Sequence, residues 1–147
     1  MKNKISIKNK KASFEFSFLE EFAAGIVLVG TEVKSVRAGT VSFTDAYCYI
    51  TNNEVFVKNI HISEYKNASY SQHDPKRERK LLLTKREIKK LKEKSQEKGL
   101  TIVPTRIFIN DKGLVKIDIA LAKGKKLYDK RESLKKKDDE RRIKENY

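Results

Sequence analysis

The sequence of 147 residues contains no tryptophan, one cysteine, two histidines and two prolines. The single cysteine, Cys48, excludes a framework of intrachain disulfides and a zinc site built from several thiolates. No apolar stretch approaches the roughly twenty residues that a membrane-spanning helix needs. The first residues, MKNKISIKNKKAS, also lack the apolar segment of a secretory signal. These absences predict a cytoplasmic protein that makes no use of a membrane, a metal ion or another cofactor.

Recognisable catalytic motifs are also missing, because the chain has no zinc-ligand spacing, no GxSxG element and no P-loop. His61 is expected near a strand end and His73 precedes a turn, so structural roles explain both better than catalysis does. A metal-dependent RNA nuclease would need the acidic side chains Glu20, Glu21, Glu32 and Asp45. Helix capping and surface solvation explain these carboxylates more simply. We therefore expect that the protein is not an enzyme.

What the chain does have is positive charge, concentrated in three blocks. It carries 34 Lys and Arg against 20 Asp and Glu, a net charge of +14. The blocks are residues 1–11, residues 76–98 and residues 123–147, and the segments between them are acidic or close to neutral. A near-neutral body with basic flanks predicts an anionic partner, and nucleic acid is the natural candidate.

The last block is the most informative part of the sequence. Residues 123–147 are good helix formers, but apolar residues are scarce, and Leu134 and Ile143 would face different directions on a helix. A segment without an apolar stripe cannot dock on a core and is also a poor membrane-surface helix. We predict two parts: a folded domain over residues 1–122 and a basic C-terminal tail over residues 123–147 that is disordered when free.

Two capping boxes predict two helices. The pattern SFLE at residues 17–20 predicts a short helix over residues 18–24, and the pattern TKRE at residues 84–87 predicts a longer one that runs to about residue 98. A glycine follows each predicted helix, in the position that commonly ends a helix in a left-handed conformation.

Runs rich in β-branched and aromatic residues predict the strands. They cover residues 26–36, 43–51, 54–60, 101–109 and 114–121, and the pair Asn52-Asn53 predicts a hairpin turn between the second and the third. Residues 65–76 are polar and predict a long loop. Five or six short strands with small helices predict a mainly β fold, and an OB-like closed antiparallel β-barrel is the best candidate at this length.

The basic blocks contain clusters suited to RNA. These are Asn9-Lys10-Lys11, residues 76–80 (KRERK) and Lys123-Gly124-Lys125-Lys126. Each Lys or Arg placed at a phosphate releases a counterion and adds affinity that does not depend on sequence. Three aromatic residues, Phe16, Tyr47 and Tyr128, are spaced among the clusters and can stack on unpaired bases. Core packing explains Phe16 and Tyr47 at least as well. It explains Tyr128 less well, because few apolar residues are near Tyr128 in the sequence.

Five segments of the chain resemble the SmpB (small protein B) family. They are NKKASFEF at 9–16, EEFAAGIVLVGTEVKSVRAG at 20–39, HDPKRERKLLLTKREI at 73–88, KGLTIVP at 98–104 and LAKGKKLYDKRESLKKKD at 121–138. Their combination is highly specific, and the resemblance covers nearly the whole chain. It implies a role in trans-translation, in which the protein binds the tRNA-like domain of transfer-messenger RNA (tmRNA). The complex is then delivered with elongation factor Tu to ribosomes stalled on messages that lack a stop codon.

The resemblance also implies which residues act. The implied RNA contacts are Asn9, Lys10, Lys11, Lys34, Arg37, Arg77, Arg79, Lys80, Leu82, Lys123, Gly124, Lys125 and Lys126. Contacts with the decoding centre of the small ribosomal subunit are implied for Tyr128, Asp129, Lys130 and Arg131, and the rest of the tail would fold as a helix in the empty mRNA channel. Three positions depart from the family pattern, since Ala23 replaces a usual Glu, Thr84 a usual Asn or His, and Phe16 a usual Tyr.

One alternative remains open from the residues. A general OB-fold RNA-binding protein, similar to a ribosomal protein or an initiation factor, would show the same basic clusters without a preference for a tRNA-like ligand. In either case we expect a monomer.

Overall fold

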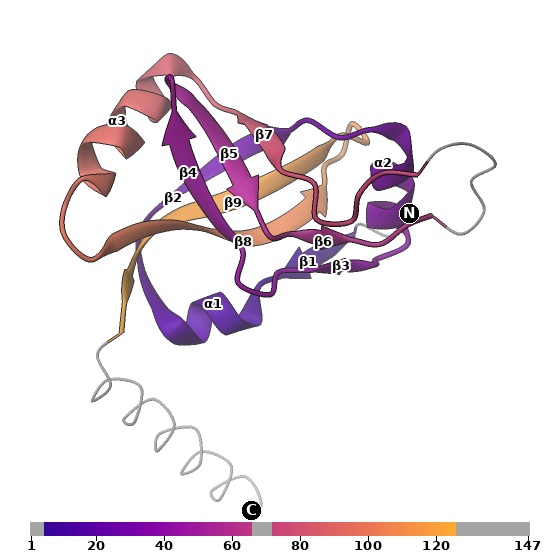
Figure 1. The fold of residues 1–147 in the computed structure, drawn as a ribbon, viewed down its shortest axis with the longest axis horizontal. Helices are drawn as coiled ribbons and strands as arrows, with labels where there is room; N and C mark the ends of the chain where they lie inside the picture. The colour runs from indigo at the N-terminus through magenta and orange to yellow at the C-terminus, as the bar shows by residue number, and fades with distance from the viewer. Residues whose placement is uncertain (1–4, 66–71, 126–147) are drawn as a thin grey trace, which may run out of the picture.

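The structure is a computed structural model that describes residues 5–65 and 72–125 (Figure 1). This part of the chain is a mainly antiparallel β fold, as the sequence predicted, and it contains three helices. The strands are β1 (Ser6–Lys8), β2 (Phe16–Ile26), β3 (Val41–Ser42), β4 (Tyr47–Thr51), β5 (Glu54–Lys58), β6 (His61–Ile62), β7 (Arg79–Leu82), β8 (Leu100–Ile109) and β9 (Val115–Gly124). The helices are α1 (Lys10–Glu15), α2 (Gly30–Arg37) and α3 (Lys85–Ser95).

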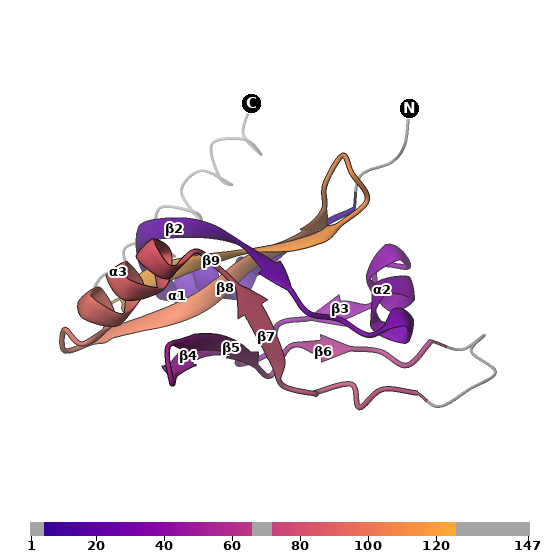
Figure 2. The ribbon, with the colours of Figure 1, turned by 90° about the horizontal axis from the view of Figure 1, so that it is seen from above.

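Seven of the strands form one sheet in the order β1-β8-β4-β5-β7-β2-β9. Strand β8 also pairs with β9, so that β8, β4, β5, β7, β2 and β9 make a ring of antiparallel pairs. The main apolar core gathers side chains from around this ring, among them Val55, Leu81, Ile107 and Ile119. Strands β3 and β6 form a separate two-stranded sheet beside α2, while α3 lies at the opposite end of the molecule (Figures 1 and 2).

The helix predicted over residues 18–24 is wrong, because these residues belong to strand β2. Phe22 and Ala24 are buried and alternate with exposed neighbours, which is the pattern of a strand with one face on a core. Glu20, which was read as part of a capping box, instead forms ion pairs with Lys90 and Lys94 of α3. Pairing of β2 with β9 and β7 therefore overrides the local helix signal.

The strand predicted over residues 26–36 is also wrong beyond Ile26. The chain turns after β2 and forms α2, in which the Glu32 carboxylate accepts the backbone N–H of Val29 over 2.9 Å. Thr31, Glu32, Ser35 and Val36 are buried at a helical spacing. Two β-branched residues of this segment, Thr31 and Val36, therefore lie on the buried face of a helix, whereas Val27 and Val29 precede the helix and are exposed.

The hairpin predicted at Asn52-Asn53 is confirmed. Both asparagines have positive φ angles, 49° and 60°, as the two central residues of a type I′ turn require. The turn pairs β4 with β5 and sets Thr51 opposite Glu54. The predicted pair of strands near the C-terminus is confirmed as well, with β8 and β9 joined by the turn at residues 110–113.

The second capping box is confirmed at the start of α3. The backbone N–H of Glu87 donates to Thr84 Oγ1, and the backbone N–H of Thr84 donates to Glu87 Oε1. The helix ends at Ser95, somewhat before the predicted residue 98, and Gly99 has the expected positive φ of 84°. Its one fully buried side chain is Leu91, so most of its surface faces solvent.

No helix in the described residues has the length and apolar character needed to cross a membrane.

Candidate nucleic-acid interface

The residues predicted to contact RNA fall into two groups at the two ends of β2. The first group surrounds α1 and the end of β9, and contains Asn9, Lys10, Lys11, Lys123, Gly124 and Lys125. The second surrounds α2 and β7, and contains Lys34, Arg37, Arg77, Arg79, Lys80 and Leu82. Phe16 pairs with Gly124 at one end of β2, and Gly25 pairs with Leu82 at the other. At ~3.3 Å per residue, the nine steps from Phe16 to Gly25 separate the two pairing positions by roughly 30 Å along the strand. Lys126 and the predicted decoding-centre residues, 128–131, lie outside the described residues.

The first group joins segments that are more than a hundred residues apart in the sequence. The backbone N–H of Lys125 donates to the Glu15 carbonyl oxygen over 2.9 Å, which fixes the end of β9 against the end of α1. Lys10, Lys11 and Lys123 are exposed around this junction. The folded chain therefore brings the N-terminal and the C-terminal basic clusters into one positively charged surface, suited to phosphate groups.

Asn9 belongs to this group by position, but its side chain is used within the protein. Its Nδ2 donates to the carbonyl oxygen of Pro104 over 2.8 Å, and its Oδ1 accepts the N–H of Ala12 over 3.2 Å. The residue is 8% exposed. Asn9 therefore caps α1 and anchors it to β8, which positions the exposed side chains of Lys10 and Lys11.

Arg79 of the second group contradicts its predicted role, because it is completely buried. Its Nε donates to Glu32 Oε2 over 2.5 Å, and its terminal nitrogens donate to the carbonyl oxygens of Ile60 (2.7 Å) and Pro75 (3.1 Å). A guanidinium with these partners and no exposed surface cannot reach a phosphate. We therefore assign Arg79 a structural role beneath this group rather than a direct RNA contact.

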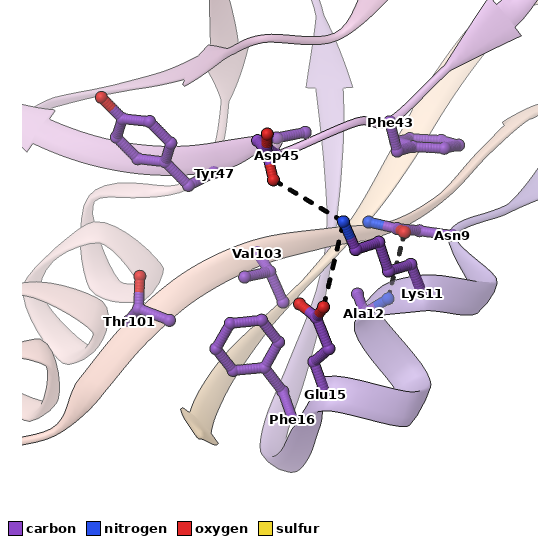
Figure 3. A pocket seen from close by; sticks show the side chains of 11 residues that line it. Asn9, Lys11, Ala12, Glu15, Phe16, Phe43, Asp45, Tyr47, Thr101 and Val103 are labelled. Atoms are coloured by element: carbon purple, nitrogen blue, oxygen red, sulfur yellow. Dashed lines mark hydrogen bonds and ion pairs between the residues drawn. The ribbon is translucent and has the colours of Figure 1, made fainter. Parts of the chain in front are cut away.

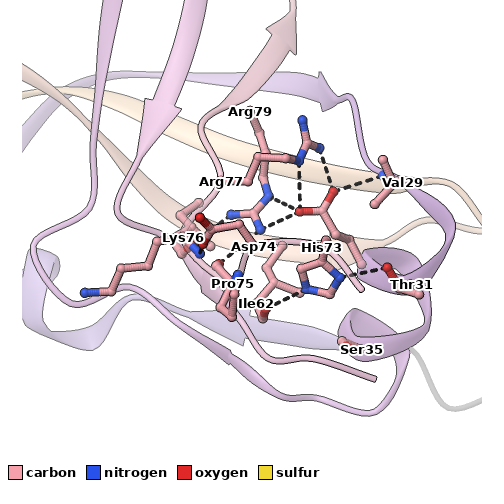
Figure 4. Close-up of polar contacts among 12 residues, drawn as sticks. Val29, Thr31, Ser35, Ile62, His73, Asp74, Pro75, Lys76, Arg77 and Arg79 are labelled. Carbon is pink, nitrogen blue, oxygen red and sulfur yellow. Dashed lines mark hydrogen bonds and ion pairs between the residues drawn. The ribbon is translucent and has the colours of Figure 1, made fainter. Parts of the chain in front are cut away.

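Glu32 is the centre of this charged network, because it forms ion pairs with both Arg77 and Arg79, which are labelled in Figure 4. Its carboxylate accepts Nε and one terminal nitrogen of Arg77, over 3.4 and 2.6 Å, in addition to Arg79 and the Val29 N–H. Burial alone would raise the pKa of Glu32, but the hydrogen bonds of Arg77 and Val29 and the charge of Arg79 hold it below its usual value. Burial lowers the pKa of Arg79, and the Glu32 carboxylate opposes that effect. The carboxylate therefore stays ionised at neutral pH and links α2 to β7.

Arg77 is the half-exposed member of the network. Its side chain is 35% exposed, and one terminal nitrogen also donates to the Val27 carbonyl oxygen over 3.2 Å. Arg77 is therefore the member of the network whose guanidinium reaches solvent.

His73 completes the same region as a structural residue. Its Nε2 lies 2.7 Å from the carbonyl oxygen of Ile62, which only accepts, so Nε2 is the donor of that hydrogen bond. Its Nδ1 lies 2.8 Å from the hydroxyl oxygen of Thr31, within hydrogen-bond distance. Both ring nitrogens are occupied inside the protein, and the side chain is buried. The expectation that this histidine is structural is confirmed.

The exposed part of the second group is formed by Lys34, Arg37, Lys80 and Leu82. Leu82 is 54% exposed, and a Cβ atom at Gly25 would lie 3.2 Å from its Cβ. The glycine therefore lets the leucine lie closely over β2. An exposed leucine flanked by cations is suited to a nucleic acid, because apolar contact with a base or sugar accompanies charge neutralisation.

Other chemistry is not supported in the described part of the chain. Residues 5–65 and 72–125 hold no group of three or more His, Cys, Asp or Glu side chains arranged to bind a metal ion. Cys48 is buried, and burial raises the pKa of its thiol, so it does not act as a thiolate.

The sequence reasoning missed how the interface is supported. Glu32 caps the start of α2, which agrees with the capping role expected from the sequence, but no sequence pattern predicts its burial against two arginines. Glu32, Arg77 and Arg79 meet only in the folded chain, so no local sequence pattern could have revealed their contact. The positive charge that residues 76–98 offer to an anionic partner was also overestimated, because Lys90 and Lys94 form ion pairs with Glu20.

The chain is similar to a known protein family in sequence and in structure. The family model described as "SmpB protein" matches residues 6–147. The SsrA-binding protein of Phocaeicola vulgatus is 58% identical over 139 residues, which cover 95% of this chain and 93% of that protein. The SsrA-binding protein of Thermosipho melanesiensis is 54% identical over 142 residues, 97% of each chain. A solved structure described as "tmRNA-SmpB: a journey to the center of the bacterial ribosome" matches with a TM-score of 0.72 and 43% identity, covering 84% of this chain and 86% of that chain. The resemblance inferred from the motifs is thereby confirmed, and the chain belongs to the SmpB protein family.

Proposed function

We propose that this protein binds the tRNA-like domain of tmRNA (SsrA) and supports its delivery to stalled ribosomes in trans-translation. The observation that carries the proposal is the presence of exposed cations at both ends of β2, in a chain whose relatives are SsrA-binding proteins. The two groups are suited to clamp a folded RNA through its phosphates and its shape rather than through its sequence. The protein acts as a binding partner and not as an enzyme.

The ring of six strands is, in this proposal, an OB-like closed barrel. The pairings of β8 with both β4 and β9 support that interpretation, since they leave each strand of the ring with two neighbours. A closed ring gives a rigid outer surface, and rigid placement of the two basic groups lets one folded RNA engage both.

The tail has a separate role. Tyr128, Asp129, Lys130 and Arg131 contact the decoding centre of the small subunit, and the following residues enter the empty mRNA channel as a helix. A helix over residues 130–144 would extend about 22 Å at 1.5 Å per residue. The basic composition of the tail supports this role, because neutralisation by ribosomal RNA offsets the entropy lost on ordering. Elongation factor Tu accompanies the RNA, and the protein acts as a monomer.

A competition experiment tests the proposal against a general RNA-binding role. The full-length protein is bound to labelled tmRNA at a fixed salt concentration, and unlabelled tmRNA or bulk tRNA is added. We expect tmRNA to compete at least about tenfold more effectively, because the tRNA-like domain presents a specific shape. Equal competition by bulk tRNA would favour a general OB-fold ribosomal or initiation-factor-like protein instead.

A further inference from the structure

A pocket of about 210 Å³ lies between α1, the segment that leads into β4, and strand β8 (Figure 3). Its polar and aromatic lining is formed by Asn9, Lys11, Glu15, Phe16, Phe43, Asp45, Tyr47 and Thr101. The volume is roughly seven times the ~30 Å³ that one water occupies in the liquid, which suits a single planar base. The pocket adjoins the first basic group, so a phosphate chain held there passes close to its mouth.

The pocket brings together two aromatic residues that are distant in sequence. Phe16 is half-buried and packs against the small apolar cluster of Ala12 and Val103, while Tyr47 is 38% exposed. Both aromatic side chains line the same pocket, beside the β8 segment whose Thr101 and Val103 also line it (Figure 3). Exposed aromatic faces of this kind are where unpaired bases stack.

The polar groups of the pocket add a preference among bases. Lys11 Nζ lies 3.9 Å from Glu15 Oε1 and 3.8 Å from Asp45 Oδ1. Both distances exceed the 2.7–3.2 Å range of an N–H···O hydrogen bond, so these ion pairs leave the carboxylate oxygens able to accept other donors. Two neighbouring N–H groups on one ring edge are the matching partner for a carboxylate. Guanine alone among the four RNA bases presents such an edge, through N1–H and the 2-amino group.

We propose that this pocket binds one unpaired guanine base of the RNA. The base stacks on Phe16 and Tyr47, its Watson–Crick edge donates to Glu15 or Asp45, and Lys11 lies near its carbonyl oxygen or a neighbouring phosphate. The inference rests on the proposed RNA-binding function and adds a base-specific site to an interface that otherwise reads phosphates and shape.

Removing a negative charge from the pocket distinguishes this proposal from non-specific phosphate binding. Replacing Asp45 by Asn removes one negative charge, so affinity that depends on phosphates alone must stay the same or rise. The proposal predicts instead that Asp45→Asn lowers the ratio of affinities for guanine-containing and other RNAs. Asn also tolerates the positive φ of 57° at this position, so the backbone conformation is retained.

The experiment uses the full-length protein and short single-stranded RNAs of uridine that carry one central G, A or C. Binding is measured by fluorescence anisotropy at one salt concentration. We expect the G-containing RNA to bind about fivefold more tightly than the A- or C-containing RNA, and Asp45→Asn or Glu15→Gln to reduce that ratio below about twofold. Tyr47→Leu should weaken binding of all the single-base RNAs relative to plain uridine RNA.

Tyr49→Leu is the matched control, since Tyr49 lies on the same strand but stacks on Phe56 outside the pocket. It should leave the guanine preference unchanged. Absence of a guanine preference in the unaltered protein, or a preference that survives both Asp45→Asn and Tyr47→Leu in variants with normal thermal unfolding, would overturn the proposal. A protein that still prefers tmRNA over tRNA in that case would show that only the pocket assignment fails.

Discussion

Nε of Arg79 donates to Oε2 of Glu32 over 2.5 Å, and neither side chain is exposed to solvent. The remaining donors of Arg79 hold the carbonyl oxygens of Ile60 and Pro75. One buried ion pair therefore joins α2, β7 and the loop that precedes β7. These are the elements that carry the exposed cations of the second basic group, so the pair fixes the geometry of the proposed RNA interface.

Replacing Glu32 with Gln should destabilise the fold strongly. Gln keeps the shape of the side chain but leaves the Arg79 charge buried without a counter-charge, which typically costs about 3–5 kcal/mol. Urea unfolding of the two proteins at neutral pH measures the difference. Glu21→Gln is the control, because Glu21 is exposed on β2, and its effect should stay within about 0.5 kcal/mol. Equal effects of the two substitutions would contradict the role assigned to Glu32.

Acidification should remove the stabilisation that Glu32 provides. Its pKa is lower in the folded protein than the usual value of 4.5. A carboxyl group whose pKa is lowered by folding stabilises the protein above its unfolded-state pKa, and that contribution is lost as the pH falls through the folded-state pKa. The free energy of unfolding should therefore fall below about pH 4.5 and fall less steeply in Glu32→Gln. Glu20, whose pKa the hydrogen bonds of Lys90 and Lys94 also lower, contributes equally in both proteins. Parallel pH curves for the two proteins would contradict this assignment.

The local elements of the fold were predictable because their causes are local. Asn52-Asn53 adopts the positive φ angles that a tight hairpin requires, and Thr84 caps α3 through its own hydroxyl. Strand β2 and helix α2 were not predictable in this way. The capping pattern at residues 17–20 is overridden by pairing with two distant strands, and the β-branched run after Ile26 becomes helical where Glu32 meets arginines from β7 and the loop before it.

The candidate site was predictable in composition but not in accessibility. The motif that contains Arg77, Arg79 and Lys80 identifies a basic segment, yet the strand alternates its side chains between two faces. Lys80 faces solvent, and its neighbour Arg79 faces the interior. Which of the two is buried depends on the position of Glu32, 47 residues earlier in the chain. No pattern within the segment carries that information.

Matched substitutions of these neighbours should separate structure from binding. Lys80→Met removes an exposed cation and should reduce the salt dependence of tmRNA binding by about one unit of slope. Arg79→Met removes a buried cation and should lower the free energy of unfolding by about 3 kcal/mol. The salt slope of the folded Arg79→Met protein should be unchanged. Binding is measured at a temperature where circular dichroism shows both variants to be folded. A lower salt slope for Arg79→Met than for the unaltered protein would indicate that Arg79 contacts the RNA directly.

Leu82 should contribute to RNA affinity without contributing to stability. It is 54% exposed, so Leu82→Ala removes little buried area, and the free energy of unfolding should change by less than about 0.5 kcal/mol. Affinity for tmRNA should fall by about fivefold, because apolar contact with the RNA is lost. Leu114 offers a control of equal exposure in the turn before β9, and Leu114→Ala should leave affinity unchanged. Equal RNA affinities for the two variants would remove Leu82 from the interface.

Truncation after Leu127 should separate RNA binding from action on the ribosome. The shortened chain keeps both basic groups of the described domain, so its affinity for tmRNA should stay within about threefold of the full-length value. Peptide tagging on ribosomes stalled at the end of a message should fall to background, because Tyr128, Asp129, Lys130 and Arg131 are absent. A chain with the tail residues in scrambled order controls for charge alone and should not restore tagging. If truncation reduced RNA binding in proportion to tagging, the tail would be an RNA anchor rather than the element that recognises the empty channel.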